Sequence, residues 1–154
     1  MSLFLRVLLS LVLPVLTLLW IPSMLWPRDG AIGPARFAAI PVIAVGVAIL
    51  ASCIVGFAVK GKGTLAPVDP PRKLVTAGLY RFVRNPMYVG GLLVLLGQAI
   101  YFQSTALLLY ALGWWLAVHL FIVLYEEPHL KSIFGSDYDE YRRTVSRWIP
   151  RLRT

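Results

Sequence analysis

The fold is decided by the stretch Met87–Tyr125, which reads MYVGGLLVLLGQAIYFQSTALLLYALGWWLAVHLFIVLY and contains no Lys, Arg, Asp or Glu in 39 residues. As one helix it would be about 58 Å long, almost twice the roughly 30 Å thickness of a bilayer's hydrocarbon core. The polar pair Gln103–Ser104 interrupts the apolar residues near the middle. We therefore expect two membrane helices, at about 86–102 and 105–125, joined by a tight turn.

Two further uncharged runs precede this stretch, Val7–Pro27 with 21 residues and Phe37–Val59 with 23. Each matches the about 20 apolar residues that a membrane helix needs. Only 14% of the 154 residues are charged, against roughly 25% in an ordinary soluble domain. The sequence predicts an all-α, polytopic membrane protein. It forms one domain over residues 1–154, with four transmembrane helices, the first two at about 5–26 and 35–59, and no room for a soluble domain.

The first uncharged run could instead belong to a signal peptide. Only one basic residue, Arg6, precedes it, and no small-x-small cleavage motif follows it. We therefore expect this run to be retained as a helix. The single cysteine, Cys53, allows no intrachain disulfide, and its expected role is that of a small buried packing residue.

Twelve of the 15 basic residues lie in two segments, 60–84 and 126–154, and the chain carries a net charge of +8. With four helices, both segments fall on the same side of the membrane, and the positive-inside rule makes that side cytoplasmic. We expect both termini there, and the 28–36 loop and the 103–104 turn outside. Basic segments beside membrane helices set topology and contact anionic lipid. No nucleic-acid-binding module is recognisable, so no nucleic-acid partner is expected.

The segments next to the predicted membrane helices are amphipathic. After Glu126-Glu127-Pro128, apolar residues recur at steps of three and four up to Trp148, which predicts one or two short helices against the membrane face, ended by Pro150. Leu74–Val83 is expected to form a short interfacial helix before Asn85-Pro86.

Two parts of the sequence contain groups that lipid-facing packing does not need. The first is Gly78–Gly91, which reads GLYRFVRNPMYVGG and contains two arginines, two tyrosines and an amide. The second is the pair Glu126-Glu127, which is followed by a tail containing Arg147. Carboxylates at the C-terminal end of a membrane helix oppose the helix dipole, so they need a specific partner.

One ligand has the complementary chemistry to these groups. In S-adenosylmethionine, the adenine suits an apolar slot with aromatic walls, and the ribose hydroxyls and amino group suit a carboxylate. The carboxylate end suits an arginine or backbone N–H groups at a helix start. All these partner types occur here on the predicted cytoplasmic side, so we expect S-adenosylmethionine to be the cofactor.

The same residues resemble the isoprenylcysteine carboxyl methyltransferase and phospholipid methyltransferase family of integral membrane enzymes. That family shows an Arg-His-Pro-x-Tyr segment, an apolar helical hairpin and a Glu-Glu pair. Here the segment reads Arg84-Asn85-Pro86-Met87-Tyr88 and the pair is Glu126-Glu127. The tail, with Phe134-Gly135, Tyr138-x-x-Tyr141 and Arg147-Trp148-Ile149-Pro150, also resembles the family, and the likeness covers about residues 61–150.

The resemblance implies a methyltransferase whose cofactor region covers about residues 76–91 and 126–150. The residues expected to act in catalysis are Arg84, Asn85, Glu127 and Arg147. Those expected to bind the cofactor are Tyr80, Arg81, Arg84, Asn85, Pro86, Tyr88, Gly90, Gly91, Glu126 and Glu127.

Asn85 stands where the family has histidine. An asparagine can donate a hydrogen bond through its amide, but it cannot carry a proton near pH 7. The two histidines, His119 and His129, lie ten residues apart, which fits no metal-ligand spacing, so no metal is expected. His119 is seven residues before Glu126, which would place both on one helix face. Its role is either functional or that of a hydrogen-bonded packing residue.

The leading functional hypothesis is an S-adenosylmethionine-dependent methyltransferase. Its expected acceptor is a lipophilic, isoprenylcysteine-like or phospholipid-like molecule that enters from the bilayer between the two hairpin helices. The alternatives are a non-catalytic membrane subunit of the same fold, which Asn85 favours, and a small four-helix transporter. The sequence leaves the methylated atom (S, N or O) and the oligomeric state open.

Overall fold

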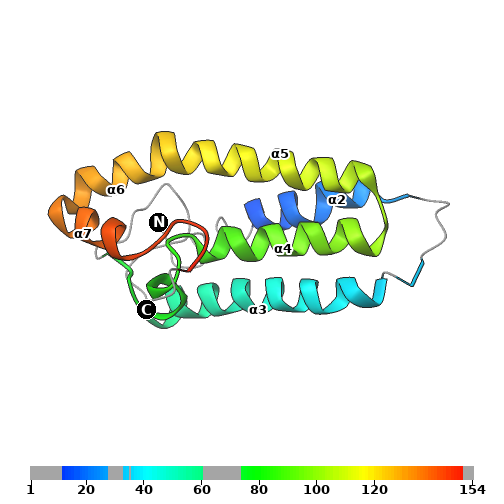
Figure 1. Ribbon diagram of the computed structural model, residues 1–154, viewed down its shortest axis with the longest axis horizontal. Helices are drawn as coiled ribbons and strands as arrows, with labels where there is room; N and C mark the ends of the chain where they lie inside the picture. Colours follow the sequence, from blue (N-terminus) through cyan, green and yellow to red (C-terminus); the bar gives the residue numbers. More distant parts are fainter. Residues whose placement is uncertain (1–11, 28–32, 35, 61–73, 151–154) are drawn as a thin grey trace.

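The computed structural model describes residues 12–27, 33–34, 36–60 and 74–150, with only the backbone for 57–60 (Figure 1). Every element within these ranges is a helix or a helical turn. The described residues contain no strand, and one isolated parallel bridge joins Val83 to Ser146. The expectation of an all-α chain is confirmed for the described residues.

The first two apolar runs form helices where they were expected. Residues 12–24 are helical and end in the π turn η1 (Leu16–Trp20) and the short α2 (Ile21–Met24). The expected start of this helix, before residue 12, lies outside the described residues. The second run forms α3 (Arg36–Lys60), which continues through Pro41 and matches the expected range to within one residue at each end.

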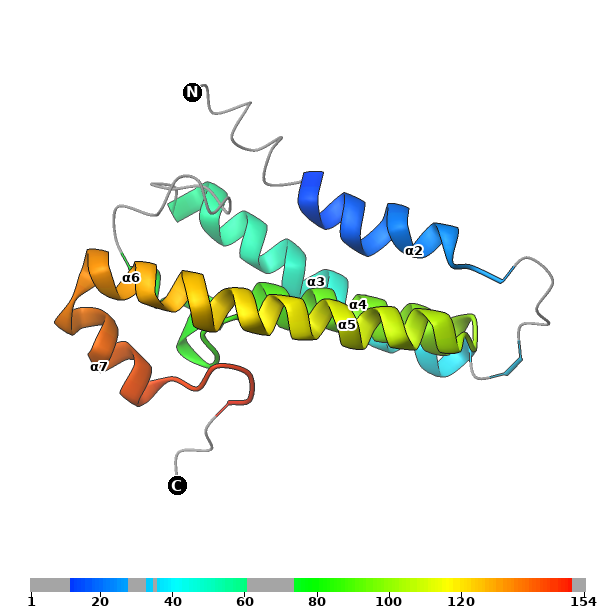
Figure 2. The ribbon, with the colours of Figure 1, turned by 90° about the horizontal axis from the view of Figure 1, so that it is seen from above.

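The decisive stretch forms the expected hairpin of α4 (Pro86–Tyr101) and α5 (Thr105–Phe121). Between them, Gln103 takes a left-handed backbone conformation with φ of 48°. The hydroxyl of Ser104 then accepts a hydrogen bond from the N–H of Leu107 and caps α5. The two helices lie side by side in Figures 1 and 2.

Beyond α5 the structure departs from the sequence-based expectation. The helix does not end at Tyr125 but continues through the π turn η3 (Ile122–Glu126) into α6 (Glu127–Phe134). A proline lacks the N–H that a continuous α-helix uses, and a π turn just before Pro128 relaxes that requirement. The predicted range 105–125 for the fourth helix is therefore too short.

The segment before α4 and the segment after α6 lie beside each other at one end of the hairpin. After a turn at Gly135 with φ of 53°, α7 (Ser136–Thr144) runs back beside the segment that leads into α4, as Figure 2 shows. The predicted helix over Leu74–Val83 is wrong, because only the 3₁₀ turn η2 (Gly78–Arg81) forms there. One or two short helices were predicted after Pro128, and α6 and α7 confirm them.

The helices pack around α4, which contacts α3, α5 and η1. Leu18, Leu95 and Ala111 form a buried cluster that joins η1, α4 and α5. Two hydrogen bonds tie the first helix to this hairpin: Gln98 Nε2 donates to the carbonyl of Leu18, and the hydroxyl of Tyr110 donates to that of Thr17, each over 2.8 Å. These helices therefore form one bundle.

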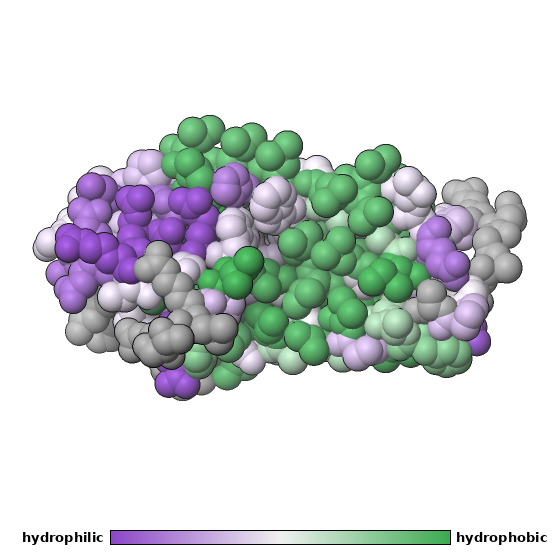
Figure 3. All heavy atoms as spheres, viewed as in Figure 1, coloured by the Kyte–Doolittle hydropathy of each residue, from purple (hydrophilic) through white to green (hydrophobic). Residues whose placement is uncertain are grey.

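Two of the helices are long and apolar enough to cross a bilayer, Arg36–Gly56 and Thr105–Phe134. Two shorter apolar helices, Val12–Met24 and Pro86–Tyr101, accompany them. Figure 3 shows hydrophobic residues over the middle of the molecule and hydrophilic residues gathered at the end formed by α6 and α7. This polar end of the bundle contains the candidate site.

Candidate functional site

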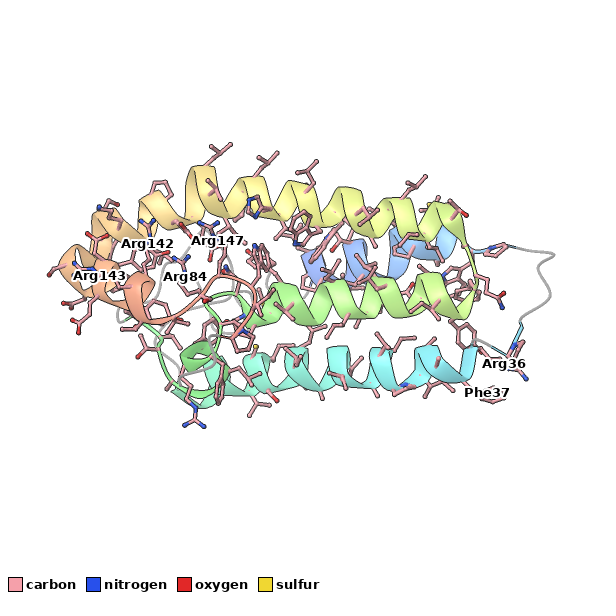
Figure 4. All side chains as sticks on the ribbon, in the orientation of Figure 1. Arg36, Phe37, Arg84, Arg142, Arg143 and Arg147 are labelled. Atoms are coloured by element: carbon pink, nitrogen blue, oxygen red, sulfur yellow. The ribbon has the colours of Figure 1, made fainter. Side chains whose placement is uncertain are left out.

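The candidate site lies where three chain segments meet at the polar end of the bundle. The start of α4 contributes residues 84–88, the junction of η3 and α6 contributes Glu126 and Glu127, and the tail after α7 contributes residues 146–148. Figure 4 shows Arg84 and Arg147 close together below the junction of α5 and α6, whereas Arg36 lies at the far end of the molecule.

Glu127 is the centre of a buried ion cluster. Its carboxylate accepts two hydrogen bonds from Arg147, from Nε to Oε1 over 2.8 Å and from Nη2 to Oε2 over 3.0 Å. Nη1 of Arg84 lies 3.1 Å from the same Oε1. Only 6% of Glu127 is exposed, so burial would disfavour its charge without these two guanidinium groups.

Arg84 keeps hydrogen-bonding capacity that the described residues do not use. Its side chain is 10% exposed, and its buried Nε and Nη1 have no hydrogen-bond partner among the described residues, although Nη1 makes the ion contact with Glu127. Two guanidinium groups and one carboxylate leave the cluster with a net charge of +1. Unused donors in a positively charged, buried site are suited to an anionic group such as a carboxylate.

Asn85 and the backbone beside it hold the tail against the start of α4. The N–H of Arg84 donates to the carbonyl of Ser146 over 2.8 Å, within the parallel bridge of Val83 and Ser146. Nδ2 of the buried Asn85 donates to the carbonyl of Arg147 over 3.4 Å. The structure thus brings the four expected catalytic residues into one connected network: Arg84, Asn85, Glu127 and Arg147.

The second acid of the pair has a different partner. The hydroxyl of Tyr88 donates to Oε2 of Glu126 over 3.1 Å. The ring of Tyr88 also lies near Trp114 of α5, with centroids 6.5 Å apart. Within the described ranges, the partner of Glu126 is therefore a neutral hydroxyl, whereas the partners of Glu127 are two cations.

Tyrosines from η2 and α7 cover the other side of this region. The hydroxyl of Tyr141 donates to the carbonyl of Tyr80 over 2.6 Å, and the side chain of Tyr80 contacts the thiol of Cys53 in α3. Burial raises the pKa of Tyr80 and of Tyr141, and it raises the pKa of Tyr138 to about 12. All three phenols are therefore neutral at pH 7.

The remaining expected cofactor residues lie around this network without joining it. Pro86 is buried at the start of α4, and Arg81 is exposed with its guanidinium over the ring of Phe82 at 4.6 Å. Gly90 packs closely against Gly46 of α3, and Gly91 faces Trp114. Their assignment as cofactor ligands stays a prediction.

His119 contacts the tail rather than Glu126. Its Nδ1 accepts a hydrogen bond from Nε1 of Trp148 over 3.2 Å. The π turn η3 adds a residue to the helical turn, so Glu127 replaces Glu126 as the acid that faces the same tail segment as His119. Trp148 was part of the expected tail motif, but no spacing rule indicated its partner.

Among the described residues, no group of three or more His, Cys, Asp or Glu side chains could hold a metal ion. The arrangement instead offers a cationic, hydrogen-bonding centre beside a buried carboxylate and aromatic rings. Such a site can bind a zwitterionic ligand.

Comparison with known proteins gives a consistent result. The sequence profile of the family described as Phospholipid methyltransferase matches residues 35–137. The Protein-S-isoprenylcysteine O-methyltransferase of Schizosaccharomyces pombe is 40% identical over 78 residues, which are 50% of this chain and 33% of that protein. The Phosphatidylethanolamine N-methyltransferase of Talaromyces marneffei is 37% identical over 67 residues, which are 44% of this chain and 7% of that protein.

A third relative matches most of this chain. The Methanethiol S-methyltransferase of Pseudomonas deceptionensis is 30% identical over 152 residues, which are 94% of this chain and 57% of that protein. The chain therefore spans less than two thirds of the length of each of these relatives. All three are named as methyltransferases, and their named acceptors differ.

Proposed function

Because the chain belongs to the phospholipid methyltransferase family, we propose that it is an integral membrane enzyme that transfers a methyl group from S-adenosylmethionine to a lipophilic acceptor. The acceptor class is isoprenylcysteine-like or phospholipid-like. The observation that supports this proposal best is the pair of buried donors on Arg84, Nε and Nη1, that have no hydrogen-bond partner among the described residues.

The charges around Arg84 fit one end of this cofactor. Its carboxylate would lie against Nε and Nη1 of Arg84, where the cluster with Glu127 and Arg147 has a net charge of +1. Glu127 already contacts both guanidinium groups: Arg147 makes a bidentate contact with its two oxygens, and Arg84 contacts Oε1 through Nη1 alone, which leaves Nε of Arg84 without a partner among the described residues. Arg84 is thus the residue that binds, and Arg147 holds Glu127 in place.

The neighbouring acid fits the other end. Among the described residues, the hydroxyl of Tyr88 is the hydrogen-bond partner of Glu126, whose carboxylate has room for further hydrogen bonds from an ammonium group or from ribose hydroxyls. The ring of Tyr88 lies beside it, with the ring of Trp114 6.5 Å further along, and the two rings supply an aromatic wall. The two acids of the pair therefore take different tasks, Glu126 in ligand binding and Glu127 in ordering the arginines.

The bound cofactor supplies an activated methyl group on a sulfonium. The chain's own residues then have to align the reactants and exclude water from them. Asn85 cannot move a proton, because its amide does not titrate near pH 7, and it holds the carbonyl of Arg147 instead. A thiolate acceptor needs no base, whereas for an amine or hydroxyl acceptor the base would be Glu126, the acid of the pair that is bound by Tyr88 rather than by the arginines.

The membrane arrangement that we propose has four spans, with both termini on the cytoplasmic side. Support comes from the two long apolar helices, the two shorter ones packed against them, and the concentration of charge at the α6–α7 end. This arrangement places the candidate site at the cytoplasmic surface, where S-adenosylmethionine is made.

A non-catalytic membrane subunit is the second candidate, and Asn85 favours it because the family's histidine is missing. A titration separates the two candidates. The purified protein in nanodiscs is titrated with S-adenosylmethionine and with its demethylated product. Binding of both in the parent and its loss in Arg84→Met support the enzyme.

The matched control is Arg36→Met, because Arg36 lies at the far end of the bundle and its guanidinium stacks on Phe37. This variant should bind both ligands like the parent. Absence of binding in the folded parent protein would overturn the proposal and leave the non-catalytic subunit.

A further inference from the structure

A cavity outside the ion cluster lies between the second half of α3 and the segment that precedes α4. Its volume is about 290 Å³. The residues that line it come from two chain segments: Ser52, Cys53 and Gly56 from α3, and Val75, Ala77, Gly78, Leu79, Tyr80, Arg81 and Phe82 from the second segment. The ion cluster of Glu127, Arg84 and Arg147 does not line it.

Two glycines keep this cavity open. A Cβ atom added at Gly56 would meet none of the described atoms within 4 Å, and the same holds at Gly78. Gly78 has φ of 66°, a left-handed conformation that favours glycine. By contrast, α3 occupies the space beside Gly90 and Gly97 of α4. A Cβ added at Gly90 would meet Gly46, and one added at Gly97 would meet Ile43. The open space along these helices is therefore on the α3–η2 side.

Most of the cavity wall is apolar, and its polar groups belong to Ser52, Cys53, Tyr80 and Arg81. The buried thiol of Cys53 and the side chain of Tyr80 are in contact inside it. Tyr80 also connects the cavity to the candidate site, because its carbonyl accepts the hydrogen bond from the hydroxyl of Tyr141 in α7. Tyr80 thus belongs both to the wall of the apolar space and to the tyrosine side of the candidate site.

The volume limits what the cavity can hold. At the roughly 30 Å³ that one water molecule occupies in the liquid, about ten non-hydrogen atoms fit. That is the size of a short alkyl or prenyl segment, and less than a whole diacyl lipid.

We propose that this cavity binds the apolar segment of the methyl acceptor nearest to its nucleophile, a single chain of about ten non-hydrogen atoms. The inference rests on the proposed methyltransferase function and moves the acceptor from the α4–α5 side, expected from the sequence, to the α3–η2 side. Two sources share this chemistry, the chain of a membrane lipid and a small free apolar molecule.

The test uses photolabelling of the full-length protein in phosphatidylcholine nanodiscs. One probe is a free octyl diazirine, and the other is a phosphatidylcholine with a diazirine in one acyl chain. Labelling is mapped by mass spectrometry to residues 75–82 and to α5. We expect at least one probe to label residues 75–82 in the parent and to be displaced there by excess octyl methyl sulfide. Labelling by the free probe alone identifies a small acceptor, and labelling by the lipid probe identifies a lipid chain.

Gly56→Phe adds a ring to the α3 wall of the cavity at a position where the added Cβ meets no described atom within 4 Å, and it should lower labelling of 75–82 several-fold. The matched control is Gly113→Phe, since Gly113 of α5 also meets nothing within 4 Å and does not line the cavity. Both variants should bind S-adenosylmethionine like the parent. Equal labelling of residues 75–82 in Gly56→Phe and in the parent overturns the cavity proposal. If the parent protein does not bind S-adenosylmethionine, only the proposed function is overturned.

Discussion

Nε1 of Trp148 donates a hydrogen bond to Nδ1 of His119 over 3.2 Å, across 29 residues of sequence. In this contact the indole N–H is the donor and Nδ1 of His119 is the acceptor. The ring of Trp115 stacks on His119 at 5.4 Å and lies 6.1 Å from the ring of Trp148. This contact ties the tail to α5 directly beside Arg147.

Trp148→Phe tests whether this attachment positions Arg147. The phenyl ring can keep the stacking, but the N–H is lost and Nδ1 of His119 loses its donor. We expect a loss of about 1 kcal/mol in stability and weaker cofactor binding. Thermal unfolding and titration with S-adenosylmethionine measure the two effects. Trp20→Phe is the control, because Trp20 is 54% exposed on the first helix. Parent-like binding in Trp148→Phe would show that the tail holds Arg147 without this bond.

The contact of Trp148 with His119 is one feature that the sequence did not predict. Helix positions followed from uncharged runs, because a bilayer core fixes the length of an apolar helix. The π turn at Ile122–Glu126 has no comparable signal, and it decides which acid faces which partner. The four expected catalytic residues lie in one network, but the motif alone did not indicate that Glu127 would be bound by two arginines.

Glu127→Ala should damage the fold more than the ligand site. It leaves the guanidinium groups of Arg84 and Arg147 without their shared carboxylate, and Arg84 is 10% exposed. Removing one partner of a buried ion pair costs about 3–5 kcal/mol. Thermal unfolding in nanodiscs should show a clearly lower midpoint, and added cofactor should raise it only slightly. An unchanged midpoint would mean that the arginines are solvated in the membrane-bound protein.

Glu126→Gln is the matched substitution in the ligand site. The amide keeps the size of the side chain and an acceptor for Tyr88, but it removes the charge. We expect parent-like unfolding and a loss of about 1.5–3 kcal/mol in cofactor binding, which is roughly tenfold to over a hundredfold in Kd. Isothermal titration measures the Kd. A parent-like Kd would remove Glu126 from the proposed cofactor site.

The proposed topology places Gln103 and Ser136 on opposite sides of the membrane. Both are exposed, and they lie at opposite ends of the bundle. Gln103→Cys and Ser136→Cys are each made in a Cys53→Ala background, which removes the only native thiol. In intact cells a membrane-impermeant maleimide should label the cysteine at position 103 alone, and after lysis it should label both. Equal labelling of both before lysis contradicts the four-span arrangement.

Close helix packing gives a prediction about stability. A Cβ added at Gly90 would lie 2.9 Å from the carbonyl oxygen of Gly46, and one added at Gly46 would lie 2.8 Å from that of Gly90. Either substitution to alanine forces α3 and α4 apart, at a cost of about 1–3 kcal/mol. Gly113→Ala should be neutral or stabilising, because nothing lies within 4 Å. Parent-like thermal unfolding of both Gly46→Ala and Gly90→Ala would show that the two helices can separate without cost.

Asn85 allows its two possible roles to be separated by substitution. If it positions the tail, the essential feature is the donor to the carbonyl of Arg147, which Asn85→Ala and Asn85→Asp both remove. Aspartate should be worse, because its charged oxygen would face that carbonyl in a site that is 7% exposed. Asn85→His restores the family's residue and can still donate through a ring nitrogen.

We therefore expect cofactor affinity to fall in the order parent, histidine, alanine, aspartate. The pH profile of methyl transfer distinguishes the two roles, because a residue 85 that only positions the tail leaves the profile unchanged. If histidine only positions the tail, the profile of Asn85→His matches that of the parent between pH 5 and 8, where imidazole changes its charge. A new pH-dependent limb in Asn85→His, with higher transfer to amine or hydroxyl acceptors, would show that residue 85 can carry a proton and that the parent lacks this step.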